Sequence, residues 1–326
     1  MSNPANRASS GALRTVFLMP VYEDRQSAVA VIAALAKLPL KDIFVVAVED
    51  GSLQDELCID DIAQNRIEGE ILYLRRNVGH QRAIAVGLMH VSQSHSPANV
   101  IVMDSDGEDA PASTLELLNG LDRGLSDVVV AQRRRRSESL GFRVFYQIYK
   151  LVFKILTGRS LHFGNFVALA PKAVRRLASM QETAVHFPGA IIASKLRAVA
   201  LPIDRGQRYF GHSKLNFVGL ALHGTRSMMV FAEDILVRVG ISCIALTVIS
   251  AVLIAIAATM KLLGYASPGW FTTVVGFLLI LVMQSGILTF VTLMMSGIVR
   301  GSASLEQSNL HTLIDRIAST QQASAT

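Results

Sequence analysis

The sequence predicts an α/β domain with a mostly parallel sheet, followed by a hairpin of two membrane-spanning helices. From residue 15, short apolar runs alternate with segments of helical spacing over about 130 residues, which is typical of a parallel sheet covered by helices on both faces. Nearer the C-terminus, two long segments lack charged residues. The chain is 51% hydrophobic with a mean hydropathy of +0.41, which is more apolar than ordinary soluble domains.

Five strands are expected in the first part of the chain. Helical segments at 25–37 and 81–91 separate some of them, and Pro111 suits the first turn of a further helix because no N–H partner is needed there. We expect the polar N-terminal residues and about the last twenty residues to be mobile. The expected strands are 15–19 (stopped by Pro20), 42–48, 71–74, 100–103 and 127–131.

The most informative motif is the pair Asp104 and Asp106, directly after the apolar run 100–103. A strand that ends in Asp-x-Asp places two carboxylates at the carboxyl edge of the sheet, where open α/β sheets bind ligands. Such oxygen donors suit Mg²⁺ or Mn²⁺, which complete their shells with water and substrate phosphates. The pair predicts a metal-assisted diphosphate site; an acidic turn without a metal is the alternative.

Two segments are long enough to cross a membrane. Residues 239–260 lack charges and would extend about 33 Å as a helix. A second uncharged run covers 262–299 and begins with a turn rich in glycine and proline. We expect spanning helices near 236–260 and 271–298. A buried hairpin in a soluble core is the alternative, but core helices are shorter.

Flanking charges predict the orientation of this hairpin. The connecting loop carries only Lys261, whereas Arg226, Arg238 and Arg300 flank the two helices on the other side. The positive-inside rule then places both chain ends in the cytoplasm, in a multi-pass inner-membrane protein. The first residues lack an apolar core, so no signal peptide is expected. Cys58 and Cys243 imply no disulfide framework.

A further membrane contact is predicted near 140–157. Polar residues recur there at intervals of four, three and four on an otherwise apolar segment, as a narrow, mainly basic stripe. This pattern is typical of a helix in the headgroup plane, and a core helix with a solvated stripe is the alternative. The stripe consists of Arg143, Gln147, Lys150 and Lys154.

The chain has a net charge of +6 and a pI near 9.5. No recognition-helix motif or aromatic basic patch accompanies the charge, so nucleic acid is not an expected partner. Anionic lipid headgroups and substrate phosphates account for the excess more simply. Gly276 and Gly286 could pack against the partner helix or against another subunit, which leaves a homo-oligomer open.

Taken in order, the motifs resemble the family 2 glycosyltransferases, and more specifically their polyprenyl-phosphate branch, which includes dolichyl-phosphate mannose synthase and bactoprenol glucosyltransferases. The resemblance runs from residue 15 to about 300 and implies the GT-A fold of nucleotide-diphospho-sugar transferases. The motifs that carry it are Pro20-Val21-Tyr22-Glu23-Asp24, Glu49-Asp50-Gly51-Ser52, Asn77-Val78-Gly79, Asp104-Ser105-Asp106, Arg133, and Arg208 through Lys214.

The resemblance implies roles for particular residues. The metal would be held by Asp104 and Asp106, with Glu108 as a further ligand, and catalysis would involve Asp106, Asp109 and Arg133. A capped turn is the alternative for Glu49 and Asp50, and Asp109 could simply begin a helix. A juxtamembrane basic patch would also explain Arg208 and Lys214. The donor-binding residues implied are Pro20, Tyr22, Glu23, Glu49, Asp50, Asn77, Asp104, Arg208, Ser213 and Lys214.

Several motifs depart from the family pattern. The first usually ends Asn-Glu, the second usually begins Asp-Asp, and Gln often stands at the position of Glu108. Many relatives have Ser-Gly-Phe-Arg where this chain has Gly164-Asn165-Phe166. These changes affect the expected substrate more than the expected reaction class.

The resemblance implies an inverting, metal-dependent hexosyltransferase that moves a sugar from a nucleotide-sugar to a polyprenyl phosphate. A lipid phosphate needs no general base, because its second pKa is about 6. A processive polysaccharide synthase is a rival interpretation, but its Gln-x-x-Arg-Trp motif is missing and Trp270 is the only tryptophan. A noncatalytic membrane scaffold is a second rival.

The expected organisation has four parts. A mobile start is followed by a cytoplasmic catalytic domain, which includes interfacial helices near 140–157 and 214–232. The transmembrane pair and a cytoplasmic tail complete the chain. The four parts are 1–14, 15–234, 235–300 and 301–326.

Overall fold

The computed structural model describes residues 14–95, 98–122, 126–133, 140–160, 163–204, 206–210, 224–265 and 267–323. The chain folds as two compact units. The first combines Met1–Ser139, Leu161–Val230 and Glu306–Thr326, and the second combines Leu140–Ser160 and Phe231–Leu305.

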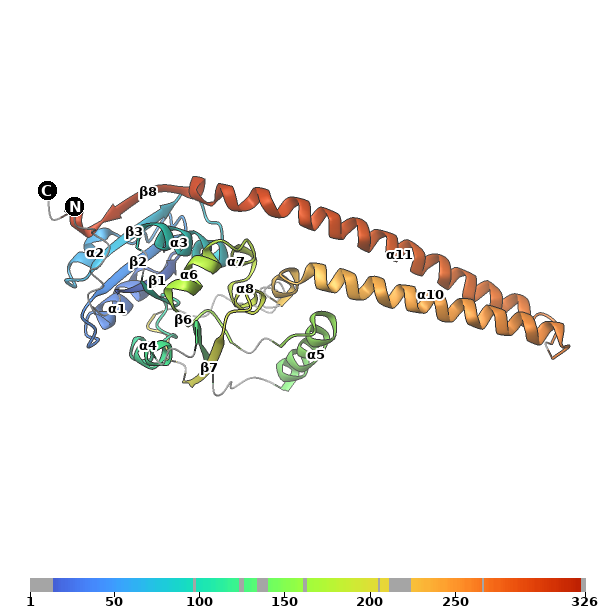
Figure 1. Cartoon of the computed structure of the whole chain (residues 1–326). Helices are drawn as coiled ribbons and strands as arrows, with labels where there is room; N and C mark the ends of the chain where they lie inside the picture. Colours follow the sequence, from blue (N-terminus) through green and yellow to red (C-terminus); the bar gives the residue numbers. More distant parts are fainter. Residues whose placement is uncertain are drawn as a thin grey trace, which may run out of the picture. The chain divides into compact units, whose positions relative to one another are not determined.

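The first unit is built on one sheet, which has eight strands within the described residues, in the order β7-β5-β6-β4-β1-β2-β3-β8 (Figure 1). The pairs β1–β2, β1–β4, β2–β3 and β5–β7 are parallel, whereas β6 and β8 are antiparallel to their neighbours. The predicted α/β class with a mostly parallel sheet is confirmed. The strands are β1 (Thr15–Val21), β2 (Ile43–Glu49), β3 (Glu68–Leu74), β4 (Asn99–Val102), β5 (Val128–Arg133), β6 (Val167–Leu169), β7 (Ala198–Ile203) and β8 (Ile314–Ser319).

Helices cover both faces of this sheet, because successive strand side chains point to opposite faces. Val16 and Leu18 of β1 belong to one apolar core, which also contains residues of α3, α6 and α8. Phe17 and Met19 belong to the other core, with residues of α1, α2 and α4. These helices and their neighbours are α1 (Arg25–Leu35), α2 (Ile59–Ala63), α3 (His80–Ser94), η1 (Pro111–Ser113), α4 (Thr114–Asp122), α6 (Pro171–Ala178), α7 (Glu182–Val185) and α8 (Phe187–Ala193).

The prediction that Pro20 stops the first strand is wrong. Pro20 lies inside β1, opposite Val48 of β2. Pairing of β1 with β4 ends at Leu18, so Pro20 occupies a stretch with a single neighbouring strand. Such a position tolerates a residue that lacks an N–H donor.

The expectation of a mobile C-terminus is also wrong for Gln307–Ala323. This segment forms η2 (Gln307–Leu313), β8 and α12 (Thr320–Ala323). β8 pairs with the edge of β3, with Ile317 opposite Leu72. The Arg316 guanidinium lies 4.0 Å from the centre of the Tyr73 ring and donates to Glu56 at 3.0 Å. An uncovered β3 edge would leave backbone groups unpaired, and β8 satisfies them.

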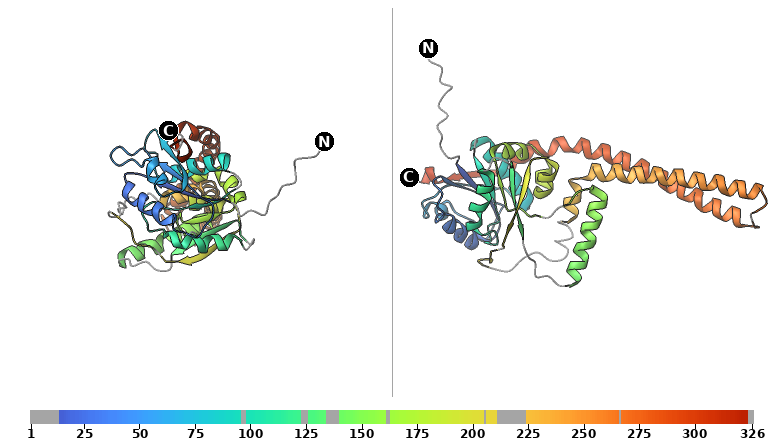
Figure 2. Two further views of the ribbon diagram at one scale, coloured as in Figure 1. Left: turned by 90° about the vertical axis from the view of Figure 1, so that its left-hand side faces the viewer. Right: turned by 60° about the horizontal axis from the view of Figure 1, so that its bottom comes forward.

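The second unit is helical: α5 (Leu140–Thr157), α10 (Ala232–Leu262) and α11 (Trp270–Glu306). α10 and α11 run side by side (Figures 1 and 2). Both are long and apolar enough to cross a membrane, over Ala232–Leu262 and Trp270–Met295. Only 11% and 6% of their most apolar windows are buried, whereas a helix inside a soluble core would be mostly covered.

Polar contacts join α10 to α11. Thr247 Oγ1 lies 2.7 Å from Ser285 Oγ, and Gly240 lies against Thr292. Gly276 and Gly286 do not make such contacts, because a Cβ on either would meet no atom within 4 Å. Close packing of these two glycines against the partner helix, one of the two alternatives expected for them, is therefore not what this structure shows.

Removal of the Arg316 side chain should loosen β8. We expect Arg316→Ala to lower the local opening free energy by about 0.5–1 kcal/mol, because a cation–π contact and an exposed ion pair are lost together. Hydrogen–deuterium exchange of the peptide 68–74 should then accelerate roughly two- to fivefold.

The matched control is Asp315→Ala. Its partner Arg75 lies 3.8 Å away and both side chains are about 60% exposed, so this pair should contribute nothing measurable. Equal exchange in the two variants would contradict the anchoring role of Arg316.

Candidate active site

The loops after β1, β2 and β4 meet at the carboxyl edge of the sheet. From β1 the chain continues through β2 and β3 on one side, whereas β4 lies on the other side of β1. This reversal of strand order is a topological switch point, and open α/β sheets bind ligands in the crevice there. β4 ends at Val102, one residue earlier than expected, and the Asp-x-Asp motif follows after Met103.

An acidic turn, residues 104–109, forms at this point. Asp106 Oδ1 accepts the backbone N–H of Glu108 at 2.9 Å, and Asp109 Oδ2 accepts that of Asp104 at 3.0 Å. Asp106 and Asp109 are buried, and the side chains of Asp104 and Glu108 are only 28% and 13% exposed. The acidic turn is thus fixed by its own side chains, and Asp109 orients its backbone.

The segment 206–210 lies over the acidic turn. Gly206 N donates to Glu108 O at 2.8 Å, and Tyr209 N donates to Asp106 O at 3.0 Å. The Arg208 guanidinium pairs with Asp106 and lies 3.6 Å from Glu108. At Gly107, with φ +88°, a Cβ would stand 2.7 Å from the Tyr209 ring, so only glycine fits under it. Arg208 therefore joins the acidic residues; Ser213 and Lys214 lie outside the described residues.

His80, which the sequence interpretation missed, is a neighbour of the acidic turn. It begins α3, and its Nε2 lies 3.2 Å from Asp104 Oδ1 and 2.9 Å from the Asn165 side-chain amide. Burial opposes a charge on His80, but the nearby carboxylates, Asp104 foremost, outweigh it and raise its pKa. The signal was available, since His80 directly follows the motif Asn77-Val78-Gly79 and must sit at the same edge of the sheet.

Asn165, where this chain departs from the family's sequence pattern, joins the side chains around the acidic turn. Its Oδ1 accepts from Gln81 at 3.2 Å, and Gln81 Oε1 accepts the backbone N–H of Phe187 at 2.5 Å. Side chains from β4, α3 and the segment before β6 are thus joined in one network. Asn165 also lines a small pocket together with Glu108, Asp109 and Asp204.

The carboxylates after β2 hold the surrounding loops. Asp50 accepts the backbone N–H groups of Val78 at 2.7 Å and Gly79 at 3.0 Å, and Glu49 accepts from Ser52 and from Leu57 N. Burial raises the pKa of both carboxyl groups, and the hydrogen bonds only partly offset it. In this structure both carboxylates hold loop backbones, and their role in donor binding stays a prediction.

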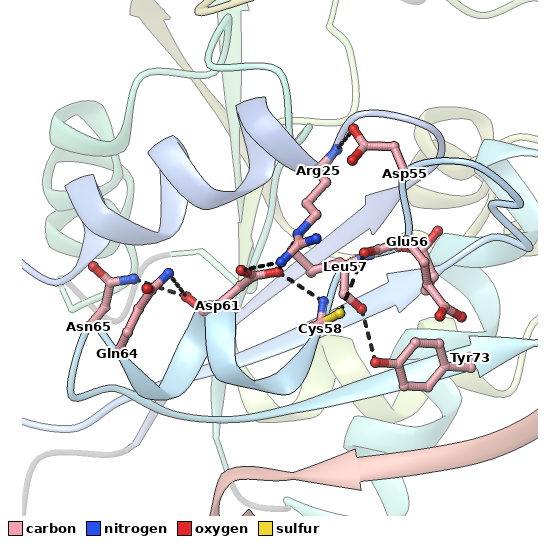
Figure 3. A network of polar contacts seen from close by, with 10 residues as sticks. Arg25, Asp55, Glu56, Leu57, Cys58, Asp61, Gln64, Asn65 and Tyr73 are labelled. Carbon is pink, nitrogen blue, oxygen red and sulfur yellow. Dashed lines mark hydrogen bonds and ion pairs between the residues drawn. The ribbon is translucent and has the colours of Figure 1, made fainter.

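Glu23, after β1, acts in the same way. Its carboxylate accepts the backbone N–H groups of Leu53 at 2.7 Å and Asp55 at 3.0 Å. The polar network beyond it, shown in Figure 3, includes the ion pair of Arg25 with Asp61, 2.7 Å between Nε and Oδ2. The loop that follows β2 is therefore held at several points.

The remaining predicted residues lie near the same edge. Tyr22 is 46% exposed just beyond β1, Asn77 is exposed after β3, and Pro20 lies within β1. Arg133 is the last residue of β5 and pairs with Ile203 of β7; its side chain lies outside the described part. Their binding roles stay predictions.

The acidic turn fits a divalent cation by its donor set. Arg208 engages the carboxylates of Asp106 and Glu108, whereas Asp104 Oδ1 lies 3.2 Å from His80 Nε2. Hard oxygen donors at a partly accessible edge suit Mg²⁺ or Mn²⁺, which retain positions for substrate phosphate. The types of donor at this turn therefore suit the predicted metal, and the ligand assignment stays a prediction.

Comparison with known proteins identifies the class. The pattern described as "Glycosyl transferase family 2" matches residues 16–183, slightly more than half of the chain. The chain belongs to this glycosyltransferase family, and its sheet has the GT-A architecture that the family resemblance implied.

Among characterised proteins, the chain is similar to transferases that carry one name. The chain is 27% identical over 214 residues to undecaprenyl-phosphate 4-deoxy-4-formamido-L-arabinose transferase of Salmonella paratyphi A, and 24% identical over 213 residues to the protein of that name from Enterobacter sp.. The match covers 62% of this chain and 63% of each relative. This chain thus matches somewhat less than two thirds of their length.

Two solved structures illustrate the similarity of this chain to known ones. One is glucosyl-3-phosphoglycerate synthase from Mycobacterium tuberculosis with Mn²⁺ and UDP, with a TM-score of 0.48, 13% identity, and coverage of 68% of this chain and 80% of that one. The other is Staphylococcus aureus TarS 1-349 with UDP-GlcNAc, with a TM-score of 0.44, 16% identity, and coverage of 68% and 66%.

Gly51 provides a test of the loop arrangement. It has φ +72°, and a Cβ there would stand 2.6 Å from backbone atoms of Arg76 and Asn77. We expect Gly51→Ala to push the two loops apart and to break the hydrogen bonds to Asp50, at a cost of roughly 1–3 kcal/mol. Hydrogen exchange of the peptide 75–80 should increase, whereas Gly276→Ala should leave it unchanged. Unaltered exchange in Gly51→Ala would contradict this packing.

Proposed function

We propose that the protein transfers a sugar from a nucleotide-diphospho-sugar to a polyprenyl phosphate, with inversion at the anomeric carbon, at the cytoplasmic face of the inner membrane. The observation that carries the proposal is the acidic turn with Asp104, Asp106 and Glu108 at the switch point of a family 2 sheet. The relatives' name supplies the acceptor class, an undecaprenyl phosphate.

The donor diphosphate is assigned to the acidic turn. Asp104, Asp106 and Glu108 would hold Mg²⁺ or Mn²⁺, which when bound neutralises charge on the departing diphosphate. Arg208 lies in the same cluster, and its planar guanidinium can bind two phosphate oxygens at once. Arg133, Ser213 and Lys214 are assigned to phosphate contacts on the family resemblance.

The reaction itself requires little from a general base. An oxygen of the lipid phosphate attacks the anomeric carbon, the bond from that carbon to the diphosphate oxygen breaks, and the nucleoside diphosphate leaves with the electron pair. The acceptor phosphate is already anionic near neutral pH. Catalysis therefore depends on holding two anions in line and on neutralising the leaving group.

The membrane contact is assigned to α5, α10 and α11. On α5, Ile148, Leu151 and Ile155 share one face and are 57%, 59% and 63% exposed, whereas Phe153 is buried against Phe231, with ring centres 5.9 Å apart. An apolar face left open to the outside suits the lipid boundary. The arginine-rich flanks of α10 and α11 support cytoplasmic chain ends.

Loss of one acidic-turn carboxylate should abolish transfer. We expect Asp106→Asn to lower kcat at least about a hundredfold, since charge stabilisation at the leaving group is lost. Membrane insertion should persist, because α10 and α11 are untouched. The measurement is Mn²⁺-dependent transfer to a lipid-extractable product, with membrane fractionation of the same sample.

Asp60→Asn is the matched control for this variant. Asp60 is an exposed carboxylate on α2, so its loss removes one charge without touching the acidic turn. Full activity of Asp106→Asn, or equal loss in Asp60→Asn, would remove the metal assignment.

A substrate screen tests the reaction class. Purified protein is incubated with undecaprenyl phosphate, Mn²⁺ and radiolabelled nucleotide-sugars, including the formamido-arabinose donor implied by the relatives' name. We expect one donor to give a lipid-extractable product of one sugar per lipid. Long polymer would favour a processive synthase, and no binding of any donor would favour a scaffold.

A further inference from the structure

A second group of metal-binding side chains lies away from the acidic turn. Glu70 is near the start of β3, His90 is in the last turns of α3, and His95 directly follows that helix. One ligand atom of each lies within 4.8 Å of the others. The acidic turn lies at the carboxyl edge of the sheet, whereas Glu70 lies toward the amino-terminal end of its strand.

Both imidazoles contact the same carboxylate oxygen. His90 Nε2 lies 2.7 Å and His95 Nε2 3.4 Å from the same oxygen, Glu70 Oε2. Two donors bound to a tetrahedral zinc at about 2.1 Å stand about 3.4 Å apart. The pair with His95 already has that separation, and the pair with His90 would lengthen by about 0.7 Å, which small side-chain rotations supply.

The surroundings hold these side chains in place. The side chains of Glu70, His90 and His95 are 18%, 13% and 10% exposed, respectively, which leaves access for a small ion. The His95 ring packs on Phe44 with centres 4.4 Å apart. The Arg14 guanidinium lies 4.3 Å from the centre of the Phe44 ring, and its charge is paired with Asp42 and Glu68.

The charge also suits a cation. Glu70 supplies a carboxylate oxygen that lies directly beside both imidazoles. Two imidazoles with one carboxylate form a set that favours Zn²⁺ over Mg²⁺.

We propose that Glu70, His90 and His95 form a zinc site with one position left for water, which fastens the C-terminal end of α3 to β3. The other end of α3 carries His80 beside Asp104. The role is structural stabilisation of the helix that supports the acidic turn, since metal binding to the folded state adds to its stability.

The test uses the full-length protein in detergent, stripped with a chelator and dialysed against Zn²⁺ with excess Mg²⁺ to occupy the acidic turn. Bound zinc is counted by mass spectrometry, and Co²⁺ absorption reports imidazole ligation. We expect one zinc per chain, a higher melting temperature with zinc, and at least tenfold weaker binding in His90→Ala and His95→Ala.

Three further variants make the result decisive. Glu70→Gln keeps the size of the side chain and its ability to form hydrogen bonds, so this variant should fold. Because the negative charge is lost, it should bind zinc more weakly than the native protein does. His311→Ala, a histidine bonded to Gln93 at 3.1 Å, and Asp106→Asn should bind zinc as the native protein does. The proposal would be overturned if the native protein bound no zinc. It would also be overturned if both His90→Ala and His95→Ala retained zinc, or if Asp106→Asn lost it.

Discussion

Mutual repulsion of carboxylates at one edge of the sheet is the constraint on which the rest of the site depends. Asp50, Asp104, Asp106 and Asp109 gather where β1 separates β2 from β4, and three of them are buried. Buried anions need donors. Backbone N–H groups, His80 and Arg208 supply them. The loops are thus organised around negative charge.

The helix α3 connects this edge to the rest of the first unit. Its apolar side chains, including Val86 and Leu88, are buried in the core on one face of the sheet. Its first residue, His80, meets Asp104, and its last turns carry His90 beside Glu70. Because α3 is held at both ends and along its length, the His80 imidazole has little freedom to move away from the acidic turn.

Much of the fold could be predicted from local patterns. Alternating apolar runs predicted the parallel sheet, and the long uncharged segments predicted α10 and α11, because both signals depend on residues near in sequence. The strand β8 could not be predicted in this way. It is short and polar, with Asp315, Arg316 and Ser319 among its six residues, and only the uncovered edge of β3, far earlier in the chain, makes it a strand.

The sequence by itself determined the acidic pair after a buried strand, the motif order of family 2 and the two apolar helices, since each is written in a contiguous run of residues. Only the tertiary structure decided which side chains meet there. His80 meets Asp104 because strand order brings them together, and Arg208 lies over the acidic turn from about a hundred residues later. Glu70 meets His90 of α3 and His95 directly after that helix. These contacts depend on strand order and helix packing, which no local pattern records.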